Sequence, residues 1–176
     1  IDLLRWWLGE VKWVSGAAPV MVPDRLDPGT GERWTATADD VAFFTAEMAS
    51  GAVAQVFMSG VAAHDMGNAT RIFGSRGTIT LSNDDEKLLF APKGEDLQDI
   101  TVTDPNADLP GVNAGIWNVS VVALMQELAS AIRDERKPSR GATFADGLAN
   151  QTVLDAVRIS GTERRWVRPE ETLAGS

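Results

Sequence analysis

Apolar and polar positions in the middle of the chain predict a pair of β-strands. The segment DDVAFFTAEMASGAVAQVFMSG contains two extended runs that meet at Ser50-Gly51, a short turn that favours an antiparallel hairpin. Alternate side chains of each run point to opposite faces, so Phe43 and Phe44 lie on different sides of the hairpin. Both faces are largely apolar. We therefore expect helices to cover one face and a second subunit to cover the other.

The last third of the chain changes to the spacing of helices. From Ala114 to about Arg133, apolar residues recur at intervals of three, four and seven, which predicts an amphipathic helix. These residues are Trp117, Val121, Leu124, Met125, Leu128 and Ile132. Thr143, with Asp146 three positions later, resembles a capping box that opens a second helix ending near Ser160-Gly161.

The remaining segments complete an α+β pattern. IDLLRWWLGEV predicts a short helix that stops at Gly9, and VKWVSGAAPV predicts a strand. We expect VPDRLDPGTGERW to be a loop, with a possible strand beginning over Arg33 to Thr37. NATRIFGSRGTITLSNDDEKLLFAPKG and LQDITVTD predict a meander, and RRWVRP a short closing strand. The order indicates an open, predominantly antiparallel sheet with helices on one face. Residues 1–168 form the domain and residues 169–176 a frayed tail.

Composition narrows the partners and the compartment. The 176 residues carry 16 Lys and Arg against 25 Asp and Glu, a formal charge of −9 that argues against nucleic acid and anionic membranes. Cysteine is absent, which excludes disulfides and thiolate chemistry. No apolar run approaches the roughly 20 residues of a membrane span, and no signal peptide is recognisable. We expect a cytoplasmic protein.

Few residues are candidates for chemistry. Gly74-x-x-Gly77 lies between predicted strands and reads as a turn rather than a phosphate-binding loop. The acidic pairs Asp39-Asp40 and Asp84-Asp85 sit at strand ends, where turn capping is favoured over acid/base chemistry.

The single histidine and one tryptophan leave two interpretations open. His64 is the only histidine, so a two-His metal site within the chain is excluded and no metal is expected. His64 is either a substrate contact or an ordinary loop residue. Trp117 and Asn118 either line a pocket at the start of the long helix or belong to the packing. For the tryptophans in apolar segments, core packing is favoured over sugar stacking.

In order, these segments resemble the C-terminal domain of the glucose-fructose oxidoreductase, inositol dehydrogenase and rhizopine-catabolism (Gfo/Idh/MocA) family. The matching stretches are IDLLRWWLGEV, TADDVAFFTAEMASGAVAQV, RIFGSRGTITL, ELASAIRDERKP and ATFADGLANQTVLDAVRISGTERRWV. Together they span nearly the whole chain.

The resemblance implies a parent enzyme with a preceding Rossmann domain that binds NAD or NADP. Family members carry a catalytic lysine in a Glu-Lys-Pro motif, followed by a segment Asp-x-x-x-His-x-x-Asp, whose last residue matches Asp2. By that spacing the catalytic histidine lies about two residues before Ile1. Asp2 is then a group that steadies this histidine, or else an acid favoured at a helix N-terminus. No cofactor is expected in the fragment, which by itself should be inactive.

The function that the resemblance implies is hydride transfer between NAD(P) and a sugar, cyclitol or related polyol. His64, Trp117 and Asn118 are the substrate-binding candidates, and the open sheet face is the expected interface of a homo-dimer or tetramer. An alternative is a stand-alone, non-catalytic oligomerisation or ligand-binding module that begins at a natural start codon near Ile1. A carbohydrate-binding domain of a hydrolase is disfavoured because two long helices do not suit a sandwich.

Overall fold

The computed structural model describes residues 1–64, 67–82, 87–113 and 115–173. These residues divide into two compact units. The first unit combines residues 1–63 with the segment from residue 142 onward, and the second comprises residues 64–141. Each unit is described separately below.

The first unit is built on a three-stranded antiparallel sheet. Its strands are β1 (Val11–Ala17), β4 (Val41–Met48) and β5 (Val53–Ser59), in the order β1-β4-β5. The predicted hairpin is confirmed, since β4 and β5 pair around the Ser50-Gly51 turn. Its register places Phe44 opposite Val56 and Phe43 opposite Phe57.

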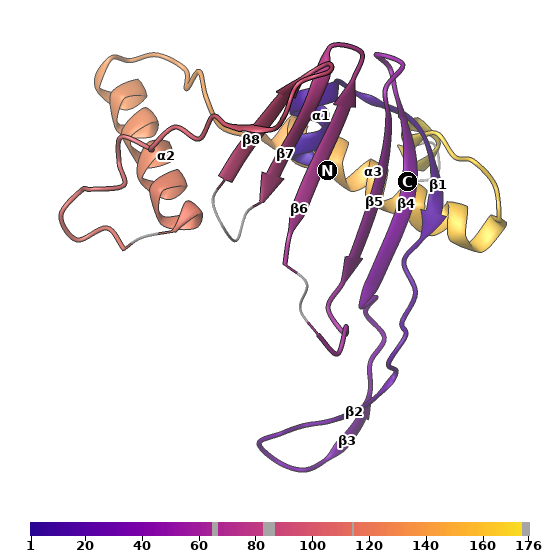
Figure 1. The fold of residues 1–176 in the computed structure, drawn as a ribbon. Coiled ribbons are helices and arrows are strands. Elements are labelled where there is room, and N and C mark those ends of the chain that lie inside the picture. The colour runs from indigo at the N-terminus through magenta and orange to yellow at the C-terminus, as the bar shows by residue number, and fades with distance from the viewer. Residues whose placement is uncertain (65–66, 83–86, 114, 174–176) are drawn as a thin grey trace. The chain divides into compact units, whose positions relative to one another are not determined.

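Two helices belong to this unit, α1 (Asp2–Leu8) and α3 (Phe144–Glu163), and α3 packs along β1. Figure 1 shows α3 behind the three strands. The predicted capping box is present, because the Thr143 hydroxyl accepts a hydrogen bond from the Asp146 amide and the Asp146 carboxylate accepts one from the Thr143 amide. Helix α1 ends at Gly9, as predicted, with a φ of 92° that suits glycine.

The chain after α3 returns to the sheet. Val167 forms an isolated bridge with Val14 where the sequence predicts a short strand. Residues 169–173 do not fray as expected but form a 3₁₀ helix, Pro169–Leu173, whose proline is buried. A hydrogen bond from the Arg168 amide to the Glu171 carboxylate fixes the start of this turn.

The core of the unit lies between the sheet and the helices. Its members combine strand and helix residues, and Val14, Ala46 and Ala156 are completely buried. Helix α3 lies very close to β1, because a Cβ placed on Gly161 would sit 2.9 Å from the Cβ of Ala17. The α+β class, with helices on one face of an antiparallel sheet, is therefore confirmed.

One expectation for this unit is wrong. The segment expected to be a loop contains β2 (Asp24–Leu26), which pairs with β3 (Arg33–Thr35) in a separate two-stranded hairpin. Pro28, Gly29 and Gly31 lie in the connection, where the Asp27 carboxylate accepts hydrogen bonds from the Gly29 and Thr30 amides. These bonds lower the pKa of Asp27 and close the turn.

The second unit contains the predicted meander and the first long helix. Strands β6 (Ala69–Gly74), β7 (Gly77–Ser82), β8 (Lys87–Pro92) and β9 (Gln98–Asp99) pair antiparallel in sequence order, and Gly74 to Gly77 form a turn between strands. Helix α2 spans Ile116–Arg133. The apolar side chains that predicted this helix are largely exposed, Trp117 and Ile132 by 83% and 70%.

No helix among the described residues has the length and apolarity that crossing a bilayer requires.

Candidate functional site

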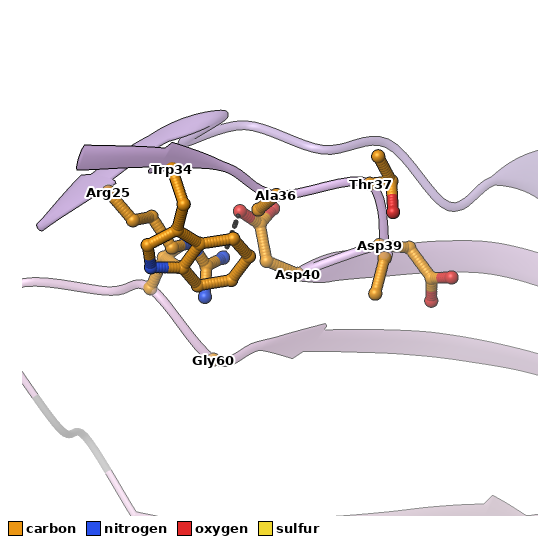
Figure 2. Close-up of a pocket in the computed structure, with 9 residues that line it drawn as sticks. Arg25, Trp34, Ala36, Thr37, Asp39, Asp40 and Gly60 are labelled. Atoms are coloured by element: carbon orange, nitrogen blue, oxygen red, sulfur yellow. Dashed lines mark hydrogen bonds and ion pairs between the residues drawn. The ribbon is translucent and has the colours of Figure 1, made fainter. Parts of the chain in front are cut away.

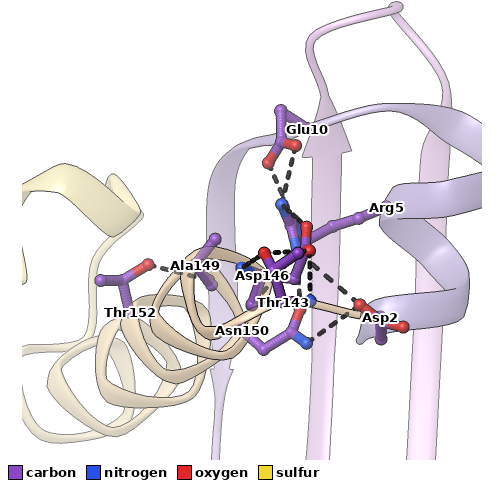
Figure 3. A network of polar contacts seen from close by, with 8 residues as sticks. All are labelled: Asp2, Arg5, Glu10, Thr143, Asp146, Ala149, Asn150 and Thr152. Carbon is purple, nitrogen blue, oxygen red and sulfur yellow. Dashed lines mark hydrogen bonds and ion pairs between the residues drawn. The ribbon is translucent and has the colours of Figure 1, made fainter. Parts of the chain in front are cut away.

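The first turn of α1 brings Asp2 against α3. The Asn150 side-chain amide donates a hydrogen bond of 3.2 Å to Oδ1 of Asp2, and Nη1 of Arg5 lies 3.8 Å from the same oxygen. Arg5 in turn donates to Oδ1 of Asn150 at 3.2 Å. Asp2, Arg5 and Asn150 therefore form a closed triangle of polar contacts (Figure 3).

Arg5 is the centre of this network. Its Nε and Nη2 atoms each donate to a different oxygen of Glu10 at 2.9 Å, a bidentate pair. The same guanidinium reaches the start of α3, where Nη1 donates to the Asp146 carbonyl at 3.3 Å and Nη2 lies 3.5 Å from the Asp146 carboxylate. Arg5 thereby ties α1 to the beginning of β1 and to the first turn of α3.

The network is buried at its centre and exposed to solvent at its edge. The Arg5 side chain is 10% exposed, whereas that of Asp2 is 52% exposed. The hydrogen bond to Glu10, with the nearby carboxylates, raises the pKa of Arg5. Hydrogen bonds from Thr143, followed by the charge of Arg5, lower the pKa of Asp146. Asp2 thus presents a carboxylate that is held on one side by fixed partners and reachable from the other.

The acidic pair Asp39-Asp40 has a structural role, but it forms contacts with distant residues instead of the turn caps that its position predicted. Asp39 binds Arg158 on α3 at 2.8 Å, and Asp40 binds Arg25 at 2.8 Å and accepts two backbone amides. Both pKa values are lowered, that of Asp39 chiefly by Arg158 and that of Asp40 chiefly by the Met21 amide. A general acid would need a raised pKa, so the pair does not suit acid/base work. Asp84 and Asp85 lie outside the described residues.

The other candidates from the sequence lie in the second unit. His64 is exposed and precedes β6. Trp117 and Asn118 are neighbours in the first turn of α2, both exposed. Their contact with a substrate stays a prediction. Across the described parts of the chain, no three His, Cys, Asp or Glu side chains gather in a way that would hold a metal ion.

Sequence reasoning missed three members of the network, Arg5, Glu10 and Asn150. Arg5 follows Asp2 by three positions, a spacing that places both on one side of a helix and is visible in the sequence. Asn150 is 148 residues from Asp2, so no local pattern connects them.

Comparison with known proteins agrees with this fold. The model of the GFO/IDH/MocA C-terminal domain matches residues 1–80. An uncharacterized oxidoreductase of Synechocystis sp. is 26% identical over 174 residues, which cover 94% of this chain and 46% of the relative. The crystal structure of an oxidoreductase domain protein from Kribbella flavida is 29% identical, with a TM-score of 0.75, covering 96% of this chain and 48% of that one.

A second solved structure is also similar to this chain in fold. Levoglucosan dehydrogenase in complex with NADH and L-sorbose has a TM-score of 0.78 at 20% identity, covering 95% of this chain and 47% of that one. The chain thus spans about half the length of the relatives that it matches. Residues 1–80 thus match the GFO/IDH/MocA C-terminal domain, and over nearly its whole length the chain is similar in fold to parts of solved oxidoreductases.

Proposed function

We propose that the chain is the substrate-binding and oligomerisation domain of an NAD(P)-dependent oxidoreductase that acts on a sugar, cyclitol or related polyol. The observation that carries the proposal is the Asp2 carboxylate, fixed by Asn150 and Arg5 and open on its other side. Relatives that are named oxidoreductases support the reaction class. The levoglucosan dehydrogenase structure, which holds NADH and L-sorbose, supports the substrate class.

The nicotinamide cofactor belongs, in this proposal, to the other half of the parent protein. The glycine pair Gly74-x-x-Gly77 joins two strands rather than a strand and a helix, so it does not have the form of a dinucleotide-binding turn. The role of this chain is therefore to position and bind. We expect the 176-residue chain by itself to be inactive.

Asp2 acts in this proposal as a positioning residue. A carboxylate beside an imidazole fixes the orientation and tautomer of the ring and stabilises its protonated form. Asn150 and Arg5 hold Asp2 in one orientation, and the bidentate Arg5–Glu10 pair holds Arg5. The network would thus fix the position of Asp2 relative to α3, and Asp2 would in turn orient a catalytic histidine just upstream of α1.

The test is Asp2→Asn in the full-length enzyme that contains this domain. We expect kcat to fall about 10–100-fold, the range for losing such an outer partner. The acid limb of the kcat profile should move to lower pH, because the histidine loses the charge that raises its pKa. Asp155→Asn, a surface change on α3, is the matched control and should leave both readouts unchanged. A loss of thermal stability with an unaltered pH profile would reduce Asp2 to a structural role.

The outer face of the β1-β4-β5 sheet is the proposed self-association surface. Phe43, Val53 and Phe57 on this face are exposed by 46%, 65% and 72%. Sheet faces of this size are normally covered, and exposed apolar patches mark interaction sites. A second copy of the chain is the proposed partner.

Phe57→Asp tests this interface, because a charge placed in a buried apolar contact opposes association. Sedimentation analysis should then show a smaller assembly than the wild type. Met58→Asp, on the opposite face of the same strand, is the matched control and should leave the mass unchanged. Equal masses for all three proteins would exclude this face as the interface.

A further inference from the structure

We propose that a pocket at the N-terminal end of β4 binds a neutral, polyhydroxylated small molecule of about monosaccharide size. The pocket lies entirely within the first unit and encloses about 330 Å³. Its walls come from the β2–β3 hairpin, the segment before β4 and the residues after β5. The pocket and the Arg5 network lie at opposite ends of β4. At the end near the network, the amide of Ala49 donates a hydrogen bond to the carbonyl of Glu10. The inference does not rest on the proposed function.

Trp34 supplies an open aromatic wall. Its side chain is half-exposed, and the guanidinium carbon of Arg25 lies 5.7 Å from the centre of its ring. Figure 2 shows the indole lying across the Arg25 guanidinium, with Asp40 beside it. An exposed indole face offers a large, rigid apolar surface to a ring-shaped ligand.

An ion pair between Arg25 and the buried Asp40 carboxylate holds this wall in place. The Asp40 side chain is 5% exposed and accepts hydrogen bonds from the Met21 amide at 2.7 Å, the Val22 amide at 3.0 Å and Arg25 Nη2 at 2.8 Å. Arg25 Nε donates to the Val22 carbonyl at 3.1 Å. Arg25 therefore has little freedom, and the ring stacked on it is preorganised. A preorganised pocket loses little entropy on binding.

The charges around the pocket favour a neutral ligand. Asp40 is paired with Arg25, and the other lining carboxylate, Asp39, is paired with Arg158. These four groups sum to zero formal charge. An anion would meet two carboxylates in a chain of net charge −9, and a cation would compete with two arginines.

Polar groups near the indole suit hydroxyl groups. Asp39 is 35% exposed and carries a carboxylate that accepts hydrogen bonds, and Thr37 offers a hydroxyl that both donates and accepts. Buried Ala36 forms an apolar part of the lining. The volume is at the lower end of the roughly 300–1,000 Å³ range of small-molecule sites, so it fits one ring with several hydroxyl groups.

The experiment is ¹⁹F NMR of the protein labelled with 5-fluorotryptophan, titrated with D-glucose. Trp34→Phe identifies the Trp34 signal by its disappearance. We expect that signal to shift saturably, and Trp34→Ala to weaken glucose binding measured by calorimetry about tenfold. Trp6→Ala is the matched control, since Trp6 is 79% exposed on α1.

A second variant closes the pocket without disturbing its ion pair. A Cβ on Gly60 would meet only the Asp40 carbonyl, at 3.6 Å, which is ordinary contact. Gly60→Val should therefore fold, reduce the space and abolish the Trp34 shift.

Three results would overturn the proposal. One is a Trp34 signal that glucose does not shift. Another is a response to D-gluconate or D-glucosamine without one to glucose, since the pocket would then select charge. The third is glucose affinity that survives in both Trp34→Ala and Gly60→Val, since glucose would then bind elsewhere, as at the substrate site of the proposed oxidoreductase.

Discussion

Two faces of one sheet, formed by alternate residues of the same strands, differ in how they are filled. On the inner face Phe44 is 6% exposed and pairs with Val56, beneath helix α3 and its neighbours. On the outer face the adjacent Phe43 is 46% exposed, and its cross-strand partner Phe57 is 72% exposed. The inner face is apolar along both strands, whereas the outer face combines its large apolar side chains with the polar residues Thr45, Glu47 and Gln55.

Packing against the helices distinguishes the inner face from the outer one. The inner face contains Ala46 and Ala54, which share the core with Ala156 of α3, and at the end of β1 Gly161 of α3 lies very close to Ala17. The outer face has large side chains that bury little of their surface and so add little to the free energy of unfolding of this chain. Apolar surface that does not stabilise the fold is available for association.

Phe44→Ala should give the largest effect among the substitutions that test this contrast. Removing a buried phenylalanine should lower the free energy of unfolding by about 3–5 kcal/mol, measured by urea denaturation followed by circular dichroism. Phe43→Ala, one position away on the outer face, should cost about 1 kcal/mol or less at protein concentrations where the chain is monomeric. Equal losses would show that both faces are packed in the free chain.

Gly161→Ala tests the close approach of helix and sheet. The added Cβ would lie 2.9 Å from the Cβ and 3.0 Å from the Cα of Ala17, so the backbone must move. We expect a loss of about 1–3 kcal/mol, the usual cost of overpacking.

Gly147→Ala is the matched control, in the same helix but with nothing within 4 Å of the new Cβ. It should stabilise by up to about 1 kcal/mol through the higher helix propensity of alanine. If Gly161→Ala also stabilised the protein, the contact between Gly161 and Ala17 would not set the distance between α3 and β1.

The sequence predicted the features that depend on neighbours in the chain. The β4–β5 register follows from side-chain alternation around a two-residue turn, and the Thr143–Asp146 capping box from a spacing of three. The helical periodicity of α2 likewise predicted Ile116–Arg133 to within about two residues at its start.

Features that depend on distant partners were not predictable in this way. The Asp2–Asn150 and Asp39–Arg158 contacts join residues 148 and 119 positions apart. Strand β2 was missed because its three residues are too few to show a period, and its partner alone defines it. The pocket at Trp34 was not predictable for both reasons. Its lining includes the short β2–β3 hairpin, and it joins this hairpin to the ends of β4 and β5.

Asp39→Asn should change the free energy of unfolding least among these substitutions. It tests the attachment of α3 at the end of the inner face. Asp39 lies just before β4 and binds Arg158 of α3 at 2.8 Å, with 35% and 53% of the two side chains exposed. An exposed pair of this kind contributes about 0.2–1 kcal/mol. Its removal should lower the free energy of unfolding by that amount at neutral pH, and less at high salt.

The pH dependence of this difference identifies its cause. The hydrogen bond from Arg158 lowers the pKa of Asp39 in the folded protein, so the stabilisation is complete above the unfolded pKa of about 3.9 and is lost as the pH falls through the lower folded value. The unfolding curves of wild type and Asp39→Asn should therefore converge below about pH 4. Arg158→Met should lose at least as much at pH 7, because it also removes the contact with Asp155, and adding Asp39→Asn to it should give no further loss from the Asp39–Arg158 pair. If the difference in the free energy of unfolding persisted in acid, the effect of Asp39 would come from the backbone around β4 and not from its charge. The Asp39–Arg158 ion pair would then not contribute to the attachment of α3.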